Sequence, residues 1–148
     1  MAKPDPARLN PASYPISAEF QTRFQDMDLN GHINNVAFAA LFESARVLLN
    51  RQVRVWNERP ANERTMVAMV TINYLAEGNF PDPVTITSGI GAIGTSSWTI
   101  FQAMFQNGHC IAVSDTVVVA RTDNQAKPLR SELRAGLEAT LMTPVTSA

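Results

Sequence analysis

The chain has one cysteine, Cys110, so it cannot form a disulfide within itself. The surrounding residues, CIAVSDTVVVA, predict that Cys110 is a core residue inside a strand and not an activated thiol. Neither charge is in excess, because 12 Lys and Arg stand against 13 Asp and Glu and give a net charge of -1. Without a basic stripe to neutralise a phosphate backbone, nucleic acid is not expected as a partner.

Long apolar runs are also missing. No segment approaches the roughly 18 consecutive apolar residues that a membrane span requires, so no membrane contact is expected. The opening stretch, MAKPDPARLNPASYP, is rich in proline and has no apolar core. It does not have the pattern of a signal peptide, and it predicts an extended lead-in over residues 1–14 of a cytoplasmic protein. The only histidines, His32 and His109, are far apart in the chain, so we expect no metal site and no cofactor.

What the sequence does contain is enough apolar material for one domain over residues 1–148, since 45% of its residues are hydrophobic. Apolar and polar residues alternate from Ile16 to Gln25, which predicts a strand. The segment VAFAALFESARVLLNRQV then repeats its apolar residues every three or four positions, which predicts a long helix. Apolar residues occupy most faces of that helix, so we expect protein to cover nearly all of it.

Four further strand-like runs follow a polar link, and they are TMVAMVTINYL, VTITSGIGAI, SWTIFQAMFQ and CIAVSDTVVVA. Asn107-Gly108 between the last two predicts a type I′ hairpin turn. In the tail, residues 128–148, a short helix from Ser131 would carry Leu133, Leu137 and Leu141. We therefore expect an α+β fold with a five-stranded antiparallel sheet wrapped around one long central helix. Its remaining apolar surface and edge strands favour a homodimer or a homotetramer.

Polar residues are concentrated in the stretch QDMDLNGHINNVAF, just before the predicted helix. Asn34 or Asn35 is suited to cap the helix, whose first backbone N–H groups have no partner within it and carry positive partial charge. Such groups can stabilise a developing oxyanion. Asp28, Asn30 and His32 lie just upstream at a spacing of two and two, so the pattern favours acyl transfer to water.

The segment DMDLNGHINNVAFAALFESAR resembles the signature of the hotdog-fold thioesterases. In that family an Asp-x-Asp-x-x-Gly-His-[Val/Ile]-Asn-Asn stretch precedes an aromatic-containing helix that ends near Glu-x-x-Arg. The segment is similar to both 4-hydroxybenzoyl-CoA thioesterase and the plant acyl-carrier-protein thioesterases. The resemblance extends roughly from Pro15 to Arg121, with the specific motif between Asp26 and Arg46.

The resemblance implies that Asp28 is the catalytic carboxylate, acting on the thioester carbonyl or as general base for a water. In the plant enzymes the residues that match Asn30 and His32 belong to the catalytic set. In 4-hydroxybenzoyl-CoA thioesterase the position that matches His32 is aliphatic. The family's helix-start amide, which polarises the carbonyl, falls at or near Asn35, and family members bind CoA at the subunit interface.

Other polar residues have a structural interpretation. We expect Asp26 to serve the turn ahead of the helix. Glu43 is a second candidate for the site, although it is equally well placed to pair with Arg46 three positions on. Phe38 and its apolar neighbours could line an acyl pocket or simply belong to the core. Three more polar residues, Ser96, Ser97 and His109, are expected in turns or at strand starts.

The function expected from the resemblance is cofactor-independent hydrolysis of an acyl-CoA by Asp28, Asn30, His32 and the amide of Asn35, with Phe38 and Glu43 binding substrate. Three alternatives stay open, namely an acyl-carrier-protein thioesterase, an enoyl-thioester hydratase or dehydratase of the same fold, and a non-catalytic acyl-thioester-binding module. The hydratase signatures, a His-Phe-Pro turn or a longer Asp-to-His segment, are absent from the sequence.

Overall fold

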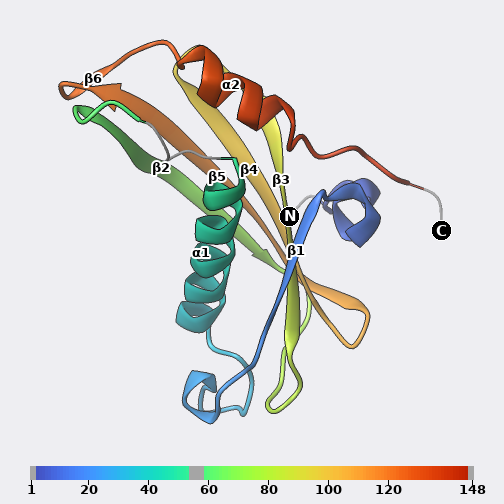
Figure 1. Ribbon diagram of the computed structural model, residues 1–148. Helices are drawn as coiled ribbons and strands as arrows, with labels where there is room; N and C mark the ends of the chain where they lie inside the picture. Colours follow the sequence, from blue (N-terminus) through green and yellow to red (C-terminus); the bar gives the residue numbers. More distant parts are fainter. Residues whose placement is uncertain (1–2, 54–58, 147–148) are drawn as a thin grey trace.

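A curved antiparallel sheet and one long helix form the centre of the structure (Figure 1). The computed structural model describes residues 3–53 and 59–146. Its strands run in the order β1-β3-β4-β5-β2, with the short β6 beside β5. The elements are η1 (Pro6–Leu9), η2 (Pro11–Ser13), β1 (Ile16–Phe20), η3 (Phe24–Asp26), α1 (Asn35–Gln52), β2 (Glu63–Tyr74), β3 (Val84–Ile93), β4 (Ser97–Gln106), β5 (His109–Thr122), β6 (Gln125–Ala126) and α2 (Ser131–Glu138). This arrangement confirms the predicted α+β class.

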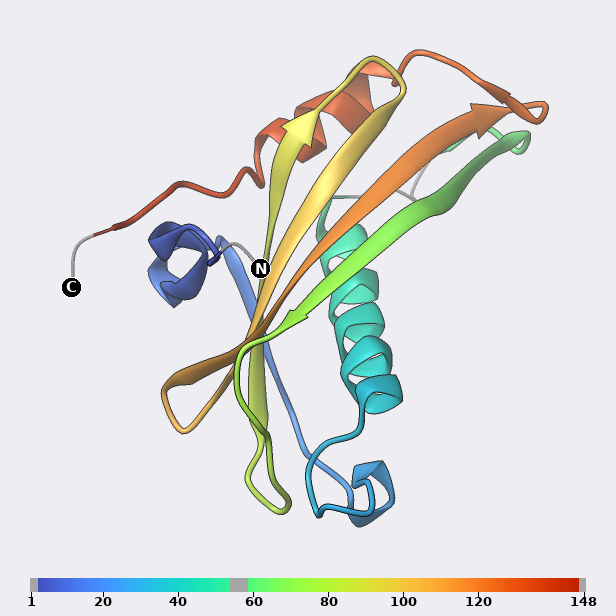
Figure 2. The same cartoon turned by 180° about the vertical axis from the view of Figure 1, so that it is seen from behind.

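Helix α1 lies in the curve of the sheet, as the two opposite views show (Figures 1 and 2). The side chains that it buries are Ala37, Phe38, Phe42, Ala45, Arg46 and Leu49. Their spacing of three and four places them on the faces of α1 that meet the sheet. Val36, Val47 and Leu48 stay exposed, so the helix is less completely covered than its sequence predicts. No helix in the described ranges is long and apolar enough to cross a membrane.

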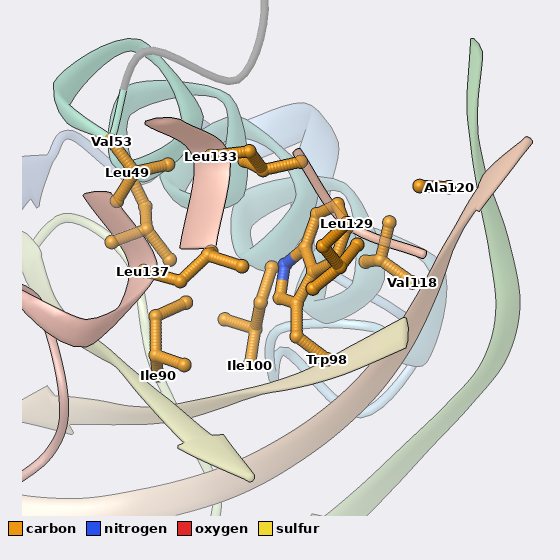
Figure 3. Close-up of a cluster of buried hydrophobic side chains, with 10 residues drawn as sticks. All are labelled: Leu49, Val53, Ile90, Trp98, Ile100, Val118, Ala120, Leu129, Leu133 and Leu137. Atoms are coloured by element: carbon orange, nitrogen blue, oxygen red, sulfur yellow. The ribbon is translucent and has the colours of Figure 1, made fainter. Parts of the chain in front are cut away.

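One cluster of buried apolar side chains lies where the end of α1 meets α2 and the sheet (Figure 3). Leu49 and Val53 from the end of α1 and Leu133 and Leu137 from α2 belong to one buried cluster with Trp98 of β4. These side chains are all nearly inaccessible to solvent. Because tightly packed apolar groups of this kind contribute most of a domain's stability, this cluster holds α1 in a fixed position over the sheet.

Some strands pair with the next strand in the chain, whereas β2 does not. Asn107 and Gly108 have φ values of 52° and 79°, which confirms the type I′ hairpin between β4 and β5. The strand β2, however, pairs with β5 and not with the next strand in the chain. Strand β2 therefore forms one edge of the sheet, and the chain passes β5 and β4 in the sheet order before it forms β3. The sixth strand, β6, was not predicted.

Three predicted boundaries were wrong. The first strand ends at Phe20 and not at Gln25, because the chain turns into η3 and leaves Phe24 79% exposed. The lead-in is not extended, since Asp5 and Asn10 each cap a 3-10 turn in it. The predicted helix in the tail is confirmed as α2, but it ends at Glu138, and Leu141 lies outside it on the surface.

The lead-in packs on the face of the sheet opposite α1. Arg8 forms an ion pair with Asp115 at 2.7 Å, its Nε donates to the Tyr14 hydroxyl at 3.1 Å, and its guanidinium lies 3.9 Å from the centre of the Phe101 ring. We call these residues, with Cys110 beside them, the outer cluster. The C-terminal segment joins the same face, because the amide of Thr143 donates to the carbonyl of Ser13.

Candidate active site

The polar loop before α1 is a tight hairpin. Met27 and Ile33 form a bridge at its base, and the amide of Asp28 donates to the carbonyl of His32 at 2.8 Å. At its tip Gly31 adopts a φ of +78°, which residues with a side chain rarely adopt. The loop therefore holds Asp28 and His32 at a fixed separation.

The helix start is capped as the sequence predicts. Asn34 is the N-cap, and its side-chain oxygen accepts from the amide of Ala37 at 2.7 Å. The preceding amides, those of Asn35 and Val36, belong to the first turn and have no carbonyl of α1 before them. They leave positive partial charge at the start of the helix.

A pocket of about 270 Å³ opens at this helix start. Its lining includes four of the predicted site residues, which are Asp28, His32, Asn35 and Phe38. Ile33, Tyr74, Ala76 and Glu77 complete it. The structure thus brings a carboxylate, an imidazole and a helix N-terminus to one concave surface.

Asp26 and Asp28 are two positions apart and differ completely in their surroundings. Asp26 is buried, and both of its oxygens accept from the guanidinium of Arg23, at 2.8 and 3.1 Å. These bonds to Arg23 hold the pKa of Asp26 below its ordinary value of 3.8. Asp28 is exposed at the pocket, and only its Oδ1 is engaged, by the amides of Asn30 and His32. Its Oδ2 has no hydrogen bond within the described chain and is free to meet a substrate or a water.

His32 has a partner that lies far away in the sequence. Its Nε2 is 3.0 Å from Oε2 of Glu77, in the segment that follows β2. That segment is tied to the loop, because the amide of Ile33 donates to the carbonyl of Gly78 at 2.8 Å. A Cβ at position 78 would come within 2.5 Å of Cδ1 of Ile33, so a larger residue there would require the Ile33 side chain to shift. With Nε2 engaged, Nδ1 is the nitrogen of His32 that stays available.

Two aromatic rings form the apolar part of the pocket. Phe38 of α1 is buried and meets Tyr74, at the end of β2, edge to face with ring centres 5.1 Å apart. Tyr74 is about half exposed, so its ring forms part of the wall at the entrance.

The model of the thioesterase-like superfamily matches residues 22–137, which include this loop, α1 and the whole of β2 to β5. The chain belongs to this superfamily. A comparison with curated proteins gives no match.

Solved structures show the same fold. The PA5185 protein from Pseudomonas aeruginosa strain PAO1 is 23% identical, with a TM-score of 0.79 over 90% of this chain and 96% of that one. A thioesterase from Thermus thermophilus, solved in complex with coenzyme A and Zn, is 24% identical, with a TM-score of 0.76 over 86% and 94% of the two chains. A member of the thioesterase superfamily from Jannaschia sp. CCS1 is 26% identical, with a TM-score of 0.76 over 84% and 81%. The predicted hotdog fold is therefore confirmed.

Two of the predicted site residues of this thioesterase-like protein lie apart from the pocket. Asn30 is exposed at the tip of the loop and does not line the pocket, although its amide helps to orient Asp28. Glu43 lies further along α1, beside a second hollow. Glu43 does not form the surface ion pair with Arg46 that the sequence allows, because Arg46 turns inward and is buried.

The remaining polar candidates have structural surroundings. Ser97 begins β4, and the carbonyl of Ser96 accepts from the amide of Ala120. His109 is exposed at the start of β5. Cys110 is half-buried, and burial raises its pKa to about 11. Within the described ranges, no three His, Cys, Asp or Glu side chains are grouped in a way that could hold a metal ion.

Tyr74 and Glu77 are the pocket residues that sequence reasoning missed. They stand more than forty positions after His32, and no local pattern connects them with the loop. They reach the pocket because β2 pairs with β5 at the edge of the sheet and ends beside the start of α1. The amides of Leu75 and Ala76 then donate to the carbonyl of Ile111, which fixes the path of the chain toward Glu77.

Proposed function

We propose that the protein is a thioester hydrolase that converts an acyl-CoA and water into a free acid and CoA, without a cofactor. The observation that carries this proposal is that the carboxylate of Asp28, the imidazole of His32 and the first residue of α1 line the same pocket. These are the three kinds of group that acyl transfer to water needs: a base, a group that orients the reactants and a site for an oxyanion.

In the proposed reaction the thioester oxygen lies at the start of α1. The amide of Asn35, with that of Val36 behind it, donates to this oxygen as it gains negative charge in the tetrahedral intermediate. Because the amides are held in place by the Asn34 cap, they need little reorganisation when the charge develops.

Asp28 supplies the base or the nucleophile. Its Oδ1 is held by two backbone amides, so Oδ2 keeps a fixed direction at the pocket. As a general base it takes a proton from water while the oxygen attacks the carbonyl carbon, and the carbon–sulfur bond then breaks to release the thiol. As a nucleophile it forms a mixed anhydride with loss of the thiol, and water then hydrolyses the anhydride. Both routes end in the same free acid.

His32 and Glu77 assist this step. The contact between Nε2 and Glu77 fixes the imidazole ring, so that Nδ1 can bind the attacking water or the substrate. Phe38 and Tyr74 offer apolar surface for the first carbons of the acyl group. Glu43 and the side chain of Asn30 lie outside this pocket and take no part in the proposed step, although the backbone amide of Asn30 helps to hold Asp28.

CoA is the proposed carrier of the acyl group, in a cytoplasmic protein. The fold neighbour from T. thermophilus that is solved with coenzyme A supports this choice. An acyl-carrier-protein thioesterase, a hydratase of the same fold and a non-catalytic binding module are the alternatives. We further propose that the working unit is a homodimer or a tetramer built from it. The edge strand β2, whose outer side has no neighbour among the described residues, supports this oligomer.

A panel of acyl-CoAs, with short, long and aromatic acyl groups, tests the proposal when free thiol is followed with a chromogenic reagent. Release of CoA by the wild-type protein, with its loss in Asp28→Asn, is the expected result. Loss of the enoyl absorbance without thiol release would show a hydratase instead. Binding of every acyl-CoA without release of thiol, in both this assay and one with acyl carrier protein, would contradict hydrolysis.

A further inference from the structure

The lining of the candidate pocket is acidic. Two of its eight described lining residues, Asp28 and Glu77, carry carboxylates, and none of the eight is Lys or Arg. His32 contributes at most one positive charge, so the net charge of this lining is negative whether or not His32 is protonated. The proposed reaction explains Asp28. From Glu77 it requires only an oxygen that holds the imidazole, which the amide of a glutamine would also supply.

The carboxylate of Glu77 is held at the pocket and is only partly used. Its Oε2 contacts Nε2 of His32 at 3.0 Å, whereas its Oε1 has no hydrogen bond within the described ranges. The next residue, Gly78, accepts from the amide of Ile33, so the backbone of this segment is tied to the catalytic loop. The side chain of Glu77 is 71% exposed, and its charge therefore acts on whatever enters the pocket from solvent.

The remaining side chains of the lining suit hydrocarbon. Phe38 and Tyr74 meet edge to face, and the first of these rings is buried. Such surfaces accept the carbons of an acyl group, but they give no compensation to a charge at its far end. The apolar members of the lining are Ile33, Phe38, Tyr74 and Ala76.

The pocket is small enough for this charge to matter throughout it. A volume of about 270 Å³ is that of a sphere about 8 Å across, which is close to the distance over which physiological salt screens a charge. The acyl group must enter the pocket, because its carbonyl carbon has to lie beside Asp28. A carboxylate a few carbons further on is then within reach of both acidic side chains.

We infer that the pocket selects acyl groups without a free carboxylate, and that Glu77 is a residue that determines this specificity. The preferred substrates are CoA thioesters of neutral acids, and the monothioesters of dicarboxylic acids are poor substrates. The charges of CoA itself are common to both classes and do not affect the choice between them. This inference rests on the proposed function, because it names the substrate class of the same site.

Pentanoyl-CoA and glutaryl-CoA provide a matched pair, because they differ only in a terminal methyl or carboxylate group. We expect the wild-type kcat/KM for pentanoyl-CoA to exceed that for glutaryl-CoA at least ten-fold at low salt. Part of this preference comes from the apolar walls, so the ratio alone does not isolate the charge. Raising the salt from about 20 to 500 mM should narrow the ratio, since screening weakens only the electrostatic part.

Variants of Glu77 isolate the charge. Glu77→Gln keeps an oxygen for His32 and should narrow the ratio about three- to five-fold, as expected for one charge near solvent. Glu77→Lys reverses the charge and should narrow the ratio further. Any general loss of turnover affects both substrates and cancels in the ratio. Glu132→Gln is the matched control, since Glu132 is exposed on α2 at the other end of α1 (Figure 1), and it should keep the wild-type ratio.

A binding measurement tests the same charge without turnover. S-pentyl-CoA and S-(4-carboxybutyl)-CoA are thioethers of equal length that cannot be hydrolysed. Calorimetry with the full chain should give tighter binding of the pentyl compound, and Glu77→Gln should reduce the difference by a similar factor. If no acyl-CoA releases thiol, the proposed hydrolysis fails, and the two dissociation constants still decide whether Glu77 discriminates by charge.

Four results would overturn the inference. An unchanged ratio in Glu77→Gln, in both kinetics and binding, would show that Glu77 does not act on the acyl group, while the proposed hydrolysis would stand. An equal gain for both substrates in that variant would show that the charge acts on the CoA arm. A wild-type preference for glutaryl-CoA would show that a cation from outside the described lining reaches the pocket. Failure of both thioethers to bind would contradict the substrate class and the proposed carrier together.

Discussion

The arginines on the two faces of the sheet differ in whether their guanidinium groups find hydrogen-bond partners. On the face away from α1, Arg8 finds a carboxylate, a hydroxyl, the carbonyl of Ser114 and an aromatic ring within its own chain. On the face toward α1, Arg46 is buried and has an unsatisfied Nη1 among the described residues. The lead-in and the segment around Thr143 cover the first face. On the second face, the edge strand β2 has no neighbour on its outer side among the described residues.

The same contrast separates Asp26 from Asp28 in the loop. Asp26 is buried and paired with Arg23, while Asp28 leaves one oxygen free at a pocket. A polar group whose partners lie within the chain contributes to folding. A polar group held in place but only partly paired is available to something outside the chain. We therefore expect changes at Arg8 and Asp26 to reduce stability, and changes at Asp28 and His32 to reduce turnover.

The largest expected effect is the loss of turnover in Asp28→Asn. We expect kcat for acyl-CoA hydrolysis to fall by about 10²- to 10⁴-fold, because a positioned acid–base group supplies that much. The melting temperature should change little, since Asp28 is exposed. Steady-state kinetics and thermal denaturation measure the two quantities. A folded variant that keeps more than about a third of wild-type turnover would mean that Asp28 is not the catalytic carboxylate.

The second prediction concerns the closed face. Arg8→Met should lower the free energy of unfolding by about 2 kcal/mol, which is less than for a fully buried pair because Asp115 is 42% exposed. Turnover per folded molecule should stay unchanged. Urea denaturation measures the loss, and Arg51→Met, a change at an exposed arginine, should be within about 0.5 kcal/mol of wild type. Equal stability of both variants would show that the outer cluster does not hold the lead-in.

A smaller loss of kcat is expected on replacing His32, the position at which the plant acyl-carrier-protein thioesterases and 4-hydroxybenzoyl-CoA thioesterase differ. His32→Ala and His32→Val should each lose roughly ten-fold in kcat at an unchanged melting temperature, which corresponds to about 1.4 kcal/mol of transition-state stabilisation. His109→Val, at an exposed position of the β4–β5 hairpin, is the control and should keep full activity. Near-normal turnover in His32→Val would mean that His32 is not catalytic and only helps to hold the loop in place.

The contribution of Asp26 to the free energy of unfolding should depend on pH. Because Arg23 lowers the pKa of Asp26 in the folded state, the pair stabilises the protein above the unfolded pKa of about 3.9 and loses this effect as the pH falls through the lower, folded value. Asp26→Asn should therefore cost about 1 kcal/mol at neutral pH and progressively less in acid. Denaturation at about pH 7, 5 and 3 checks this, and a difference that stays constant over that range would contradict it.

The smallest effect is expected at Cys110. Burial raises the pKa of its thiol to about 11, so at pH 8 only about one part in a thousand is thiolate. The native protein should react slowly with a chromogenic thiol reagent, and one thiol per chain should appear in guanidinium. Rapid labelling of the native state would mean that the outer cluster opens readily, and that the closed face is less closed than the structure indicates.

Much of the fold and the loop of the candidate site could be predicted because their signals are local. The alternation in β3 and β4, the β-branched residues of β5, the Asn107-Gly108 turn and the Asn34 cap each depend on residues within a few positions of one another. The motif from Asp26 to Arg46 likewise sets its own loop, because Gly31 and the amides around Asp28 act over only four residues.

Features that depend on distant partners could not be predicted in this way. The pairing of β2 with β5, the contact of Glu77 with His32 and the position of Arg8 on the sheet all join residues far apart in the chain. Arg46 is the clearest example, since its position after Glu43 on α1 suggested a surface ion pair. Packing turned it inward instead, because that face of α1 lies against the sheet.

The sequence by itself determined where the long helix and the strands β2 to β5 lie, which loop carries the polar groups and how the helix begins. Those properties follow from hydrophobic periodicity, turn chemistry and capping, which act between near neighbours. Only the tertiary structure decided which face of each element is covered, which distant residues complete the pocket and which polar groups stay unpaired. Burial and hydrogen bonding depend on what surrounds a side chain in space, and a sequence pattern does not fix that.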